Sequence, residues 1–72
     1  MKSTALKPRE AYRVMFPDYP DVVGIEQLQS MLGIGRKLAY RLIQDGQIES
    51  LRIGRTYKIP KANVISYITQ RT

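Results

Sequence analysis

Five polar side chains in the middle of the sequence have the types and spacing of an anion-binding surface. They are Arg36, Lys37, Tyr40, Arg41 and Gln44. Steps of three and four residues place the last four on one face of a helix, with Arg36 beside them. Arginine and lysine bind phosphate groups or the edge of guanine. The opposite face carries Ala39, Leu42 and Ile43, so we expect that face to pack on a core.

The roles expected of these side chains differ. Arg36 and Lys37 lie in the first helical turn, where a cation opposes the helix dipole by roughly 0.3–1 kcal/mol, so a purely structural role does not favour them. For Arg36 a base contact and a phosphate contact are equally open, and phosphate is favoured for Lys37. Arg41 is interpreted as a phosphate clamp or base reader, and Gln44 as reaching the nucleic-acid backbone. Tyr40 can contact sugar or phosphate, or pack against a neighbouring element.

Glycines divide this region into two short helices. Gly24 is a permissible N-cap for residues 25–32, whose apolar residues recur at helical spacing. Gly33 occupies the place of a left-handed C-cap. Gly35 can cap a second helix over residues 36–45, and Gly46 ends it. A helix, a tight glycine turn and a second helix predict a helix-turn-helix, with the cationic face on the second helix.

An alternating pattern after Gly46 predicts a β-hairpin. Its apolar residues are Leu51, Ile53, Tyr57 and Ile59. A three-residue loop over 54–56 would pair Ile53 with Tyr57, and Leu51 with Ile59, placing all four on one face. We prefer this register, although such loops usually have glycine last, and Gly54 comes first. A two-residue loop would set Leu51 opposite Lys58.

The polar residues of the hairpin predict that it is a wing, a hairpin that binds DNA beside the second helix of the helix-turn-helix. Arg55 lies at the tip in either register and is the best candidate for a minor-groove or phosphate contact. Arg52, Thr56 and Lys58 are expected to support it, with Arg52 and Lys58 pointing away from the apolar row. Tyr57 is interpreted as a core residue.

We expect a helix at the C-terminal end of the sequence and a basic arm at the N-terminal end. Pro60 is well placed to begin a last helix, whose apolar stripe closes the core and which ends near Arg71. That helix has no extended heptad pattern, so we expect a monomer in solution. Residues 1–20 are expected to form a basic, partly ordered arm with a helical turn or two over 10–15, ahead of a domain spanning 21–72. The arm either lies along DNA or is a leader pinned by one or two aromatic side chains.

Composition narrows the function classes. The 72 residues contain no cysteine and no histidine, which excludes thiolate metal sites and the usual general base, so we expect no enzyme, cofactor or metal. No apolar run approaches the roughly 20 residues of a membrane span, and no secretory signal is evident. The net charge is +6, with lysine and arginine concentrated in residues 33–61 and absent from 17–32. This distribution is equally typical of a one-sided surface that binds a polyanion and of a solvated basic surface that keeps a small protein soluble. We expect the protein in the cytoplasm, on the nucleoid.

Residues 22–68 resemble the excisionase-family DNA-binding domains, a compact winged-helix group related to the DNA-binding half of MerR-type regulators. The matching pieces are LGIGRK, YRLIQDGQI, RIGR and the IPK before the last helix. The resemblance implies a mainly α fold with a small β-hairpin: two helices in helix-turn-helix arrangement, a wing and a third helix. It also implies a recognition helix at 36–45 for the major groove and a wing at 52–58 for the minor groove.

The resemblance further implies a non-enzymatic protein that binds double-stranded DNA. Many members are recombination directionality factors that assist an integrase, and neighbouring copies on DNA would supplement a weak monomer. A small transcriptional regulator on the same fold is the closest alternative, and a protein-interaction module using residues 38–40 is a more distant one. The residues expected to contact DNA are Gly35, Arg36, Lys37, Tyr40, Arg41, Gln44, Arg52, Arg55, Thr56 and Lys58.

Overall fold

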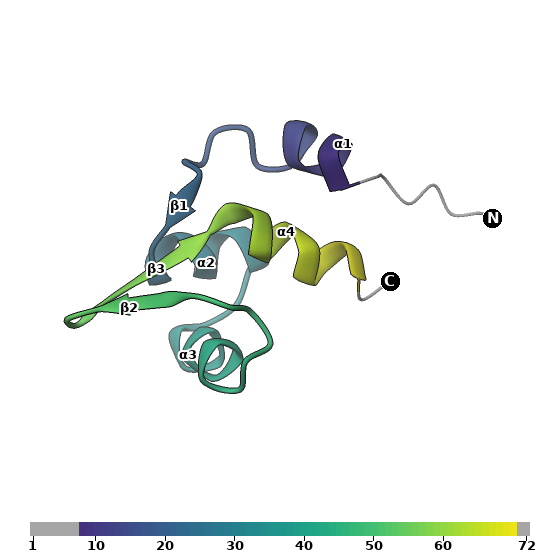
Figure 1. The fold of residues 1–72 in the computed structure, drawn as a ribbon. Coiled ribbons are helices and arrows are strands. Elements are labelled where there is room, and N and C mark those ends of the chain that lie inside the picture. The colour runs from purple at the N-terminus through teal and green to yellow at the C-terminus, as the bar shows by residue number, and fades with distance from the viewer. Residues whose placement is uncertain (1–7, 71–72) are drawn as a thin grey trace.

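The computed structural model describes residues 8–70 of the chain. Its elements in order are α1 (Pro8–Val14), β1 (Val22–Val23), α2 (Ile25–Leu32), α3 (Arg36–Gln44), β2 (Leu51–Ile53), β3 (Thr56–Pro60) and α4 (Lys61–Gln70). The β2–β3 hairpin projects to one side, and α1 and α3 lie on opposite sides of α4 (Figure 1). This arrangement is the winged helix-turn-helix expected from the sequence. Within the described range, no helix is long and apolar enough to cross a membrane.

The helix-turn-helix forms where the glycine pattern placed it. Gly24 caps α2 in an extended conformation, and the Gln27 side chain accepts a hydrogen bond from the Gly24 N–H at 2.9 Å. Gly33 follows α2 with a φ of 65°, a left-handed conformation that glycine adopts without a steric penalty. Gly35 caps α3, which ends at Gln44, one residue earlier than predicted. The turn holds α3 against α2 with its cationic face outward.

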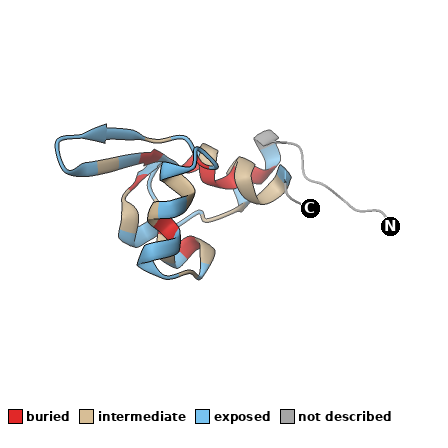
Figure 2. Ribbon diagram, turned by 90° about the horizontal axis from the view of Figure 1, so that it is seen from below, coloured by how far each residue is buried: buried red, intermediate tan, exposed pale blue. Residues whose placement is uncertain are grey.

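The core lies where the helices and the base of the sheet meet. Its largest fully buried side chains are Leu28, Ile48, Ile59, Val23 and Val64. The buried residues gather among the helices and at the hairpin base, while the rest of the hairpin is largely exposed (Figure 2). On α3, Ala39 is fully buried, and Leu42 and Ile43 pack against the cluster, as the helical spacing predicted. Because the core is thin, few side-chain contacts hold the hairpin to the helices.

The sheet has a third strand that the sequence did not reveal. β1 pairs antiparallel with β3, so the strand order is β1-β3-β2. Val23 lies opposite Ile59, and both are buried. A strand of two residues is too short to produce an alternating pattern in the sequence. β1 fixes the base of the hairpin to the start of α2.

The predicted hairpin register is wrong. Leu51 pairs with Lys58, Arg52 with Tyr57 and Ile53 with Thr56, so the loop has two residues. Gly54 takes a φ of 62°, whereas Arg55 does not have a positive φ, which is the pattern of a type II′ turn with glycine first. The turn chemistry therefore outweighed burial of the apolar row.

The observed register also corrects the faces of the hairpin. Leu51 and Ile53 are exposed by 61% and 56% instead of facing the core. Arg52 lies on the same face as Tyr57, so the expectation that it points away with Lys58 is wrong. Tyr57 is half-buried and packs against the core cluster, as predicted.

The N-terminal segment is attached to the domain through Lys61. α1 packs on α4 with Ala11 fully buried. The Lys61 ammonium is buried and donates to the carbonyl oxygens of Phe16 at 3.3 Å and Tyr19 at 3.0 Å. The same ammonium lies 4.9 Å from the centre of the Tyr12 ring. We refer to this region as the α1–α4 joint.

The helices nearest the two ends of the described range are α1 and α4. The helical turns expected over residues 10–15 are present as α1, although they begin at Pro8. The last helix runs to Gln70, and its expected end near Arg71 lies outside the described residues, as do residues 1–7. α1 lies across α4 from α3, so the described part of the arm is distant from the predicted recognition helix (Figure 1).

Candidate nucleic-acid interface

The outer face of α3 presents most of the predicted binding side chains to solvent. The exposed ones are Arg36, Lys37, Arg41 and Gln44, and Gly35 is exposed at the N-terminus of the helix. Tyr40 is half-buried. Leu38 is 44% exposed. α3 therefore presents mostly polar side chains to solvent on one face, while Ala39 is buried on the opposite face.

Tyr40 is directed toward the hairpin rather than away from the protein. Its ring centre lies 5.7 Å from that of Tyr57, at an interplanar angle of 65°. The Arg36 guanidinium carbon lies 5.5 Å from the centre of the Tyr40 ring, and its Nη2 donates to the Tyr40 hydroxyl at 3.4 Å. Of the two alternatives for Tyr40, the structure displays packing against the wing. Its hydroxyl remains beside a cation on the α3 surface.

The predicted wing residues are distributed over the tip and both faces. Arg55 is exposed at the tip, and Thr56 and Lys58 are exposed on β3. Arg52 instead lies along the face directed toward α3, with its guanidinium carbon 5.6 Å from the centre of the Tyr57 ring. Its Nε donates to the Gly54 carbonyl oxygen at 3.1 Å, which ties it to the turn. The structure thus brings Arg52 toward α3, and leaves Lys58 on the other face.

An open groove of about 590 Å³ lies between the start of α2, the first turn of α3 and the wing. Its lining residues are Gly24, Ile25, Glu26, Gln27, Arg36, Tyr40, Arg55, Thr56 and Tyr57. Arg36 and Arg55 bring positive charge to two of its walls, and Glu26 brings a carboxylate to the third. The two guanidinium groups suit phosphate, because charged donors bind phosphate oxygens strongly, whereas the Glu26 carboxylate opposes an anion at the α2 side of the groove. We call this feature the helix–wing groove.

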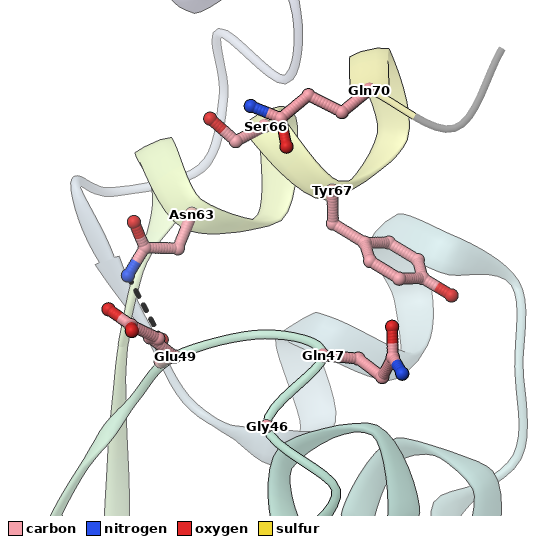
Figure 3. A pocket seen from close by; sticks show the side chains of 7 residues that line it. All are labelled: Gly46, Gln47, Glu49, Asn63, Ser66, Tyr67 and Gln70. Carbon is pink, nitrogen blue, oxygen red and sulfur yellow. Dashed lines mark hydrogen bonds between the residues drawn. The ribbon is translucent and has the colours of Figure 1, made fainter.

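A second hollow of about 410 Å³ has the opposite character. It lies between the α3–β2 connection and α4, and is lined by Gly46, Gln47, Glu49, Asn63, Ser66, Tyr67 and Gln70 (Figure 3). The Asn63 side-chain nitrogen donates to the Glu49 carbonyl oxygen at 3.0 Å. Among residues 8–70, no lysine or arginine lines this hollow, and the Glu49 carboxylate would repel phosphate. Of these two hollows, the helix–wing groove is the one whose described lining carries arginine.

Two features of this surface were not predicted from the sequence. The contact between Arg52 and Tyr57 depends on the two-residue loop, which Gly54 at the first loop position could have indicated. The start of α2 lines the groove only because β1 fixes it beside the hairpin. Within residues 8–70, no group of acidic residues is arranged to hold a metal ion.

Comparison with known proteins agrees with this geometry. A family model described as a helix-turn-helix domain matches residues 22–72. Over 43 residues, the chain is 42% identical to a protein named "Probable excisionase" from Saccharopolyspora erythraea. That match covers 60% of this chain and 44% of the relative, so the chain spans under half the length of that protein. No solved structure matches. The resemblance to excisionase-family domains inferred from the sequence is confirmed.

Proposed function

We propose that this chain, which belongs to the helix-turn-helix domain family, binds double-stranded DNA with α3 in the major groove and the wing in the adjacent minor groove. The observation that carries the proposal is the helix–wing groove, where Arg36 and Arg55 come from the two elements that would enter the two grooves. A phosphate between them would fix the register of both elements on one duplex.

The side chains of α3 divide into base readers and phosphate holders. Arg36 and Lys37 lie in its first turn, the part of a recognition helix that meets base edges in the major groove. Arg36 can pair with guanine or hold phosphate, and Lys37 suits phosphate. Arg41, one turn later, clamps phosphate or reads a base, and Gln44 reaches the backbone. Gly35 leaves the helix N-terminus free of a side chain, so a backbone phosphate can approach its N–H groups.

The wing would contribute a shorter contact. Arg55 at its tip enters the minor groove or binds its phosphates, because narrow minor grooves attract arginine. Thr56 and Lys58 extend the same contact along β3, and Arg52 lies on the side nearer α3. A surface of this size binds DNA weakly as a single copy, so several copies on adjacent sites, or a bound partner, would be needed for function.

The biological role that we favour is assistance to an integrase during excisive recombination. A relative with 42% identity over 43 residues carries the name "Probable excisionase", which supports this role. A small transcriptional regulator on the same fold is the second candidate, and either role places the protein on the nucleoid. Selection of bound sites from a random DNA pool separates the two, because repeated sites flanking a recombination point favour excision and sites over a promoter favour regulation.

DNA binding is tested with a matched pair of arginine variants. Arg41 lies on the outer face of α3, whereas Arg13 is an exposed arginine on α1, across α4 from that face. We expect Arg41→Ala to weaken binding to a selected duplex and, if it binds phosphate, to lower the slope of log K against log salt by about 0.9. Arg13→Ala should change neither quantity. Equal losses in both variants would mean that only net charge matters, and no binding by the wild type would favour the protein-interaction alternative.

A further inference from the structure

We infer that Tyr57 is a positioning residue that couples the wing to the recognition helix, so that the two elements meet DNA as one unit. The inference rests on the proposed function and adds a mechanism to it. Tyr57 belongs to a continuous row of side chains that crosses from α3 to β2. The row runs from Arg36 through Tyr40 and Tyr57 to Arg52, and we call it the aromatic bridge.

The spacing along the aromatic bridge is regular. The guanidinium carbon of Arg36 is 5.5 Å from the Tyr40 ring centre, the two ring centres are 5.7 Å apart, and the Arg52 carbon is 5.6 Å from the Tyr57 ring. The rings meet edge to face, which is a favourable arrangement for aromatic pairs. Each guanidinium lies within the distance at which a cation is attracted to a ring. Every neighbour in the row is therefore in favourable contact with the next.

Burial along the hairpin singles out Tyr57. Of residues 51–58, it is the one that is not exposed. The next anchor is Ile59, which is fully buried at the base of the hairpin. Beyond Ile59, the hairpin is therefore held to the helices chiefly through the Tyr57 ring. Without that ring, the tip would be free to change its angle to α3.

The angle of the wing matters because its contact is made at the far end. Arg55 lies in the turn at the tip, two residues before Tyr57 in the sequence. A hairpin that is already set against α3 delivers Arg55 to the minor groove without further ordering on binding, and pre-organisation of this kind raises affinity. A loosened hairpin would still carry Arg55 but would have to order it at the expense of affinity. Arg36 and Arg52 gain in the same way, since the rings restrict their guanidinium groups.

The first test uses the free protein. In Tyr57→Leu we expect the ¹⁵N order parameters of the wing amides, residues 52–56, to fall from values near 0.85 toward those of flexible segments, below about 0.6, while those of α3 stay high. Tyr57→Phe retains the ring and should keep the wild-type values. If Tyr57→Leu does not fold, Tyr57→Ile, which suits a strand, gives the same comparison. Unchanged wing order in a folded variant without the ring would overturn the coupling, whatever the DNA measurements show.

The second test asks whether Arg55 depends on Tyr57 for its effect on a selected duplex. We expect Arg55→Ala to weaken binding about tenfold in the wild-type and Tyr57→Phe backgrounds, and less than about threefold in Tyr57→Leu. Hydroxyl-radical footprints should lose minor-groove protection in Tyr57→Leu and keep the protection beside α3. Equal losses from Arg55→Ala in all three backgrounds would refute the inference but leave DNA binding intact. Failure of the wild type to prefer the selected duplex would instead refute the proposed function.

Discussion

Two regions of this molecule use positively charged side chains in opposite ways. In the α1–α4 joint, Lys61 is only 5% exposed, and its ammonium lies beside two backbone carbonyl oxygens and the Tyr12 ring. On α3 and the wing, Arg41 and Arg55 are exposed to solvent. The first cation is satisfied by the chain itself, and the others remain accessible to an external anion. Net charge alone therefore overstates the charge available for DNA.

Replacing Lys61 should change the free energy of unfolding more than replacing an exposed cation. We expect Lys61→Met to lower the free energy of unfolding by about 2–3 kcal/mol, because two carbonyl oxygens lose a charged donor. Urea denaturation measures this change. Lys58→Met, at an exposed position on the wing, should alter stability by no more than about 0.5 kcal/mol.

The same pair of lysine variants has a second readout in DNA binding. At temperatures where Lys61→Met is folded, its affinity for DNA should match that of the wild type. If Lys61→Met instead lost affinity with no loss of stability, Lys61 would belong to the binding surface and the comparison would fail.

Substitution of Gly54, in the turn of the wing, should cause a loss of stability of intermediate size. It has a φ of 62°, and no heavy atom lies within 4 Å of an added Cβ, so Gly54→Ala introduces backbone strain without a clash. We expect a loss of about 1–3 kcal/mol, the usual range for a non-glycine residue held in a sparsely populated backbone conformation. Thermal unfolding measures the loss, and DNA affinity should also fall as the tip changes shape.

Gly35→Ser is the matched control on α3, because Gly35 has ordinary φ and equally open surroundings. A serine N-cap should raise stability by only a few tenths of a kcal/mol. Equal destabilisation by both substitutions would show that the turn of the wing has no special demand for glycine.

The smallest expected effect is a pH dependence in the α1–α4 joint. The Tyr12 hydroxyl donates to the Asp21 carboxylate. This hydrogen bond, together with desolvation and the negative charge of Asp21, raises the pKa of Tyr12 above its usual value of 10.0. Since the pKa is higher in the folded state, the stability from this bond is present below pH 10 and is lost as the pH rises through the folded pKa.

Tyr12→Phe isolates this contribution. Urea unfolding between pH 8 and pH 12 should show a constant difference in stability between wild type and Tyr12→Phe at the lower end of the range. The difference should shrink at the upper end, where the hydroxyl proton of the folded wild type is also lost. A difference that stayed constant throughout would exclude Tyr12 as an alkaline-sensitive contact. DNA affinity below pH 9 should not respond to this substitution.

The sequence predicted the helices and the faces of α3 because helical periodicity and glycine caps act locally. Ala39 is buried and Arg41 is exposed for reasons contained within one helix. The hairpin register failed because burial of four apolar residues competed with the turn chemistry of Gly54, and the turn prevailed. The aromatic bridge could not be derived, since it needs the correct register.

Features formed by distant residues were the least predictable. Lys61 is buried because its partners are backbone carbonyl oxygens, which carry no sequence signal. Ile48, in the connection between α3 and β2, is only 1% exposed although it lies outside every helix and strand. Periodicity cannot identify such a position.

The long reach of Lys61 also has a consequence for the order of folding. Its two carbonyl partners lie 45 and 42 residues away in sequence, whereas α2 and α3, and likewise β2 and β3, are neighbours along the chain. Closing a longer loop costs more conformational entropy, so we expect the helix-turn-helix and wing to form early and α1 to dock afterwards. Removal of the Lys61 ammonium should then accelerate unfolding while leaving the refolding rate nearly unchanged. Docking of α1 would then be a late folding step, and its detachment would set the lifetime of the native state.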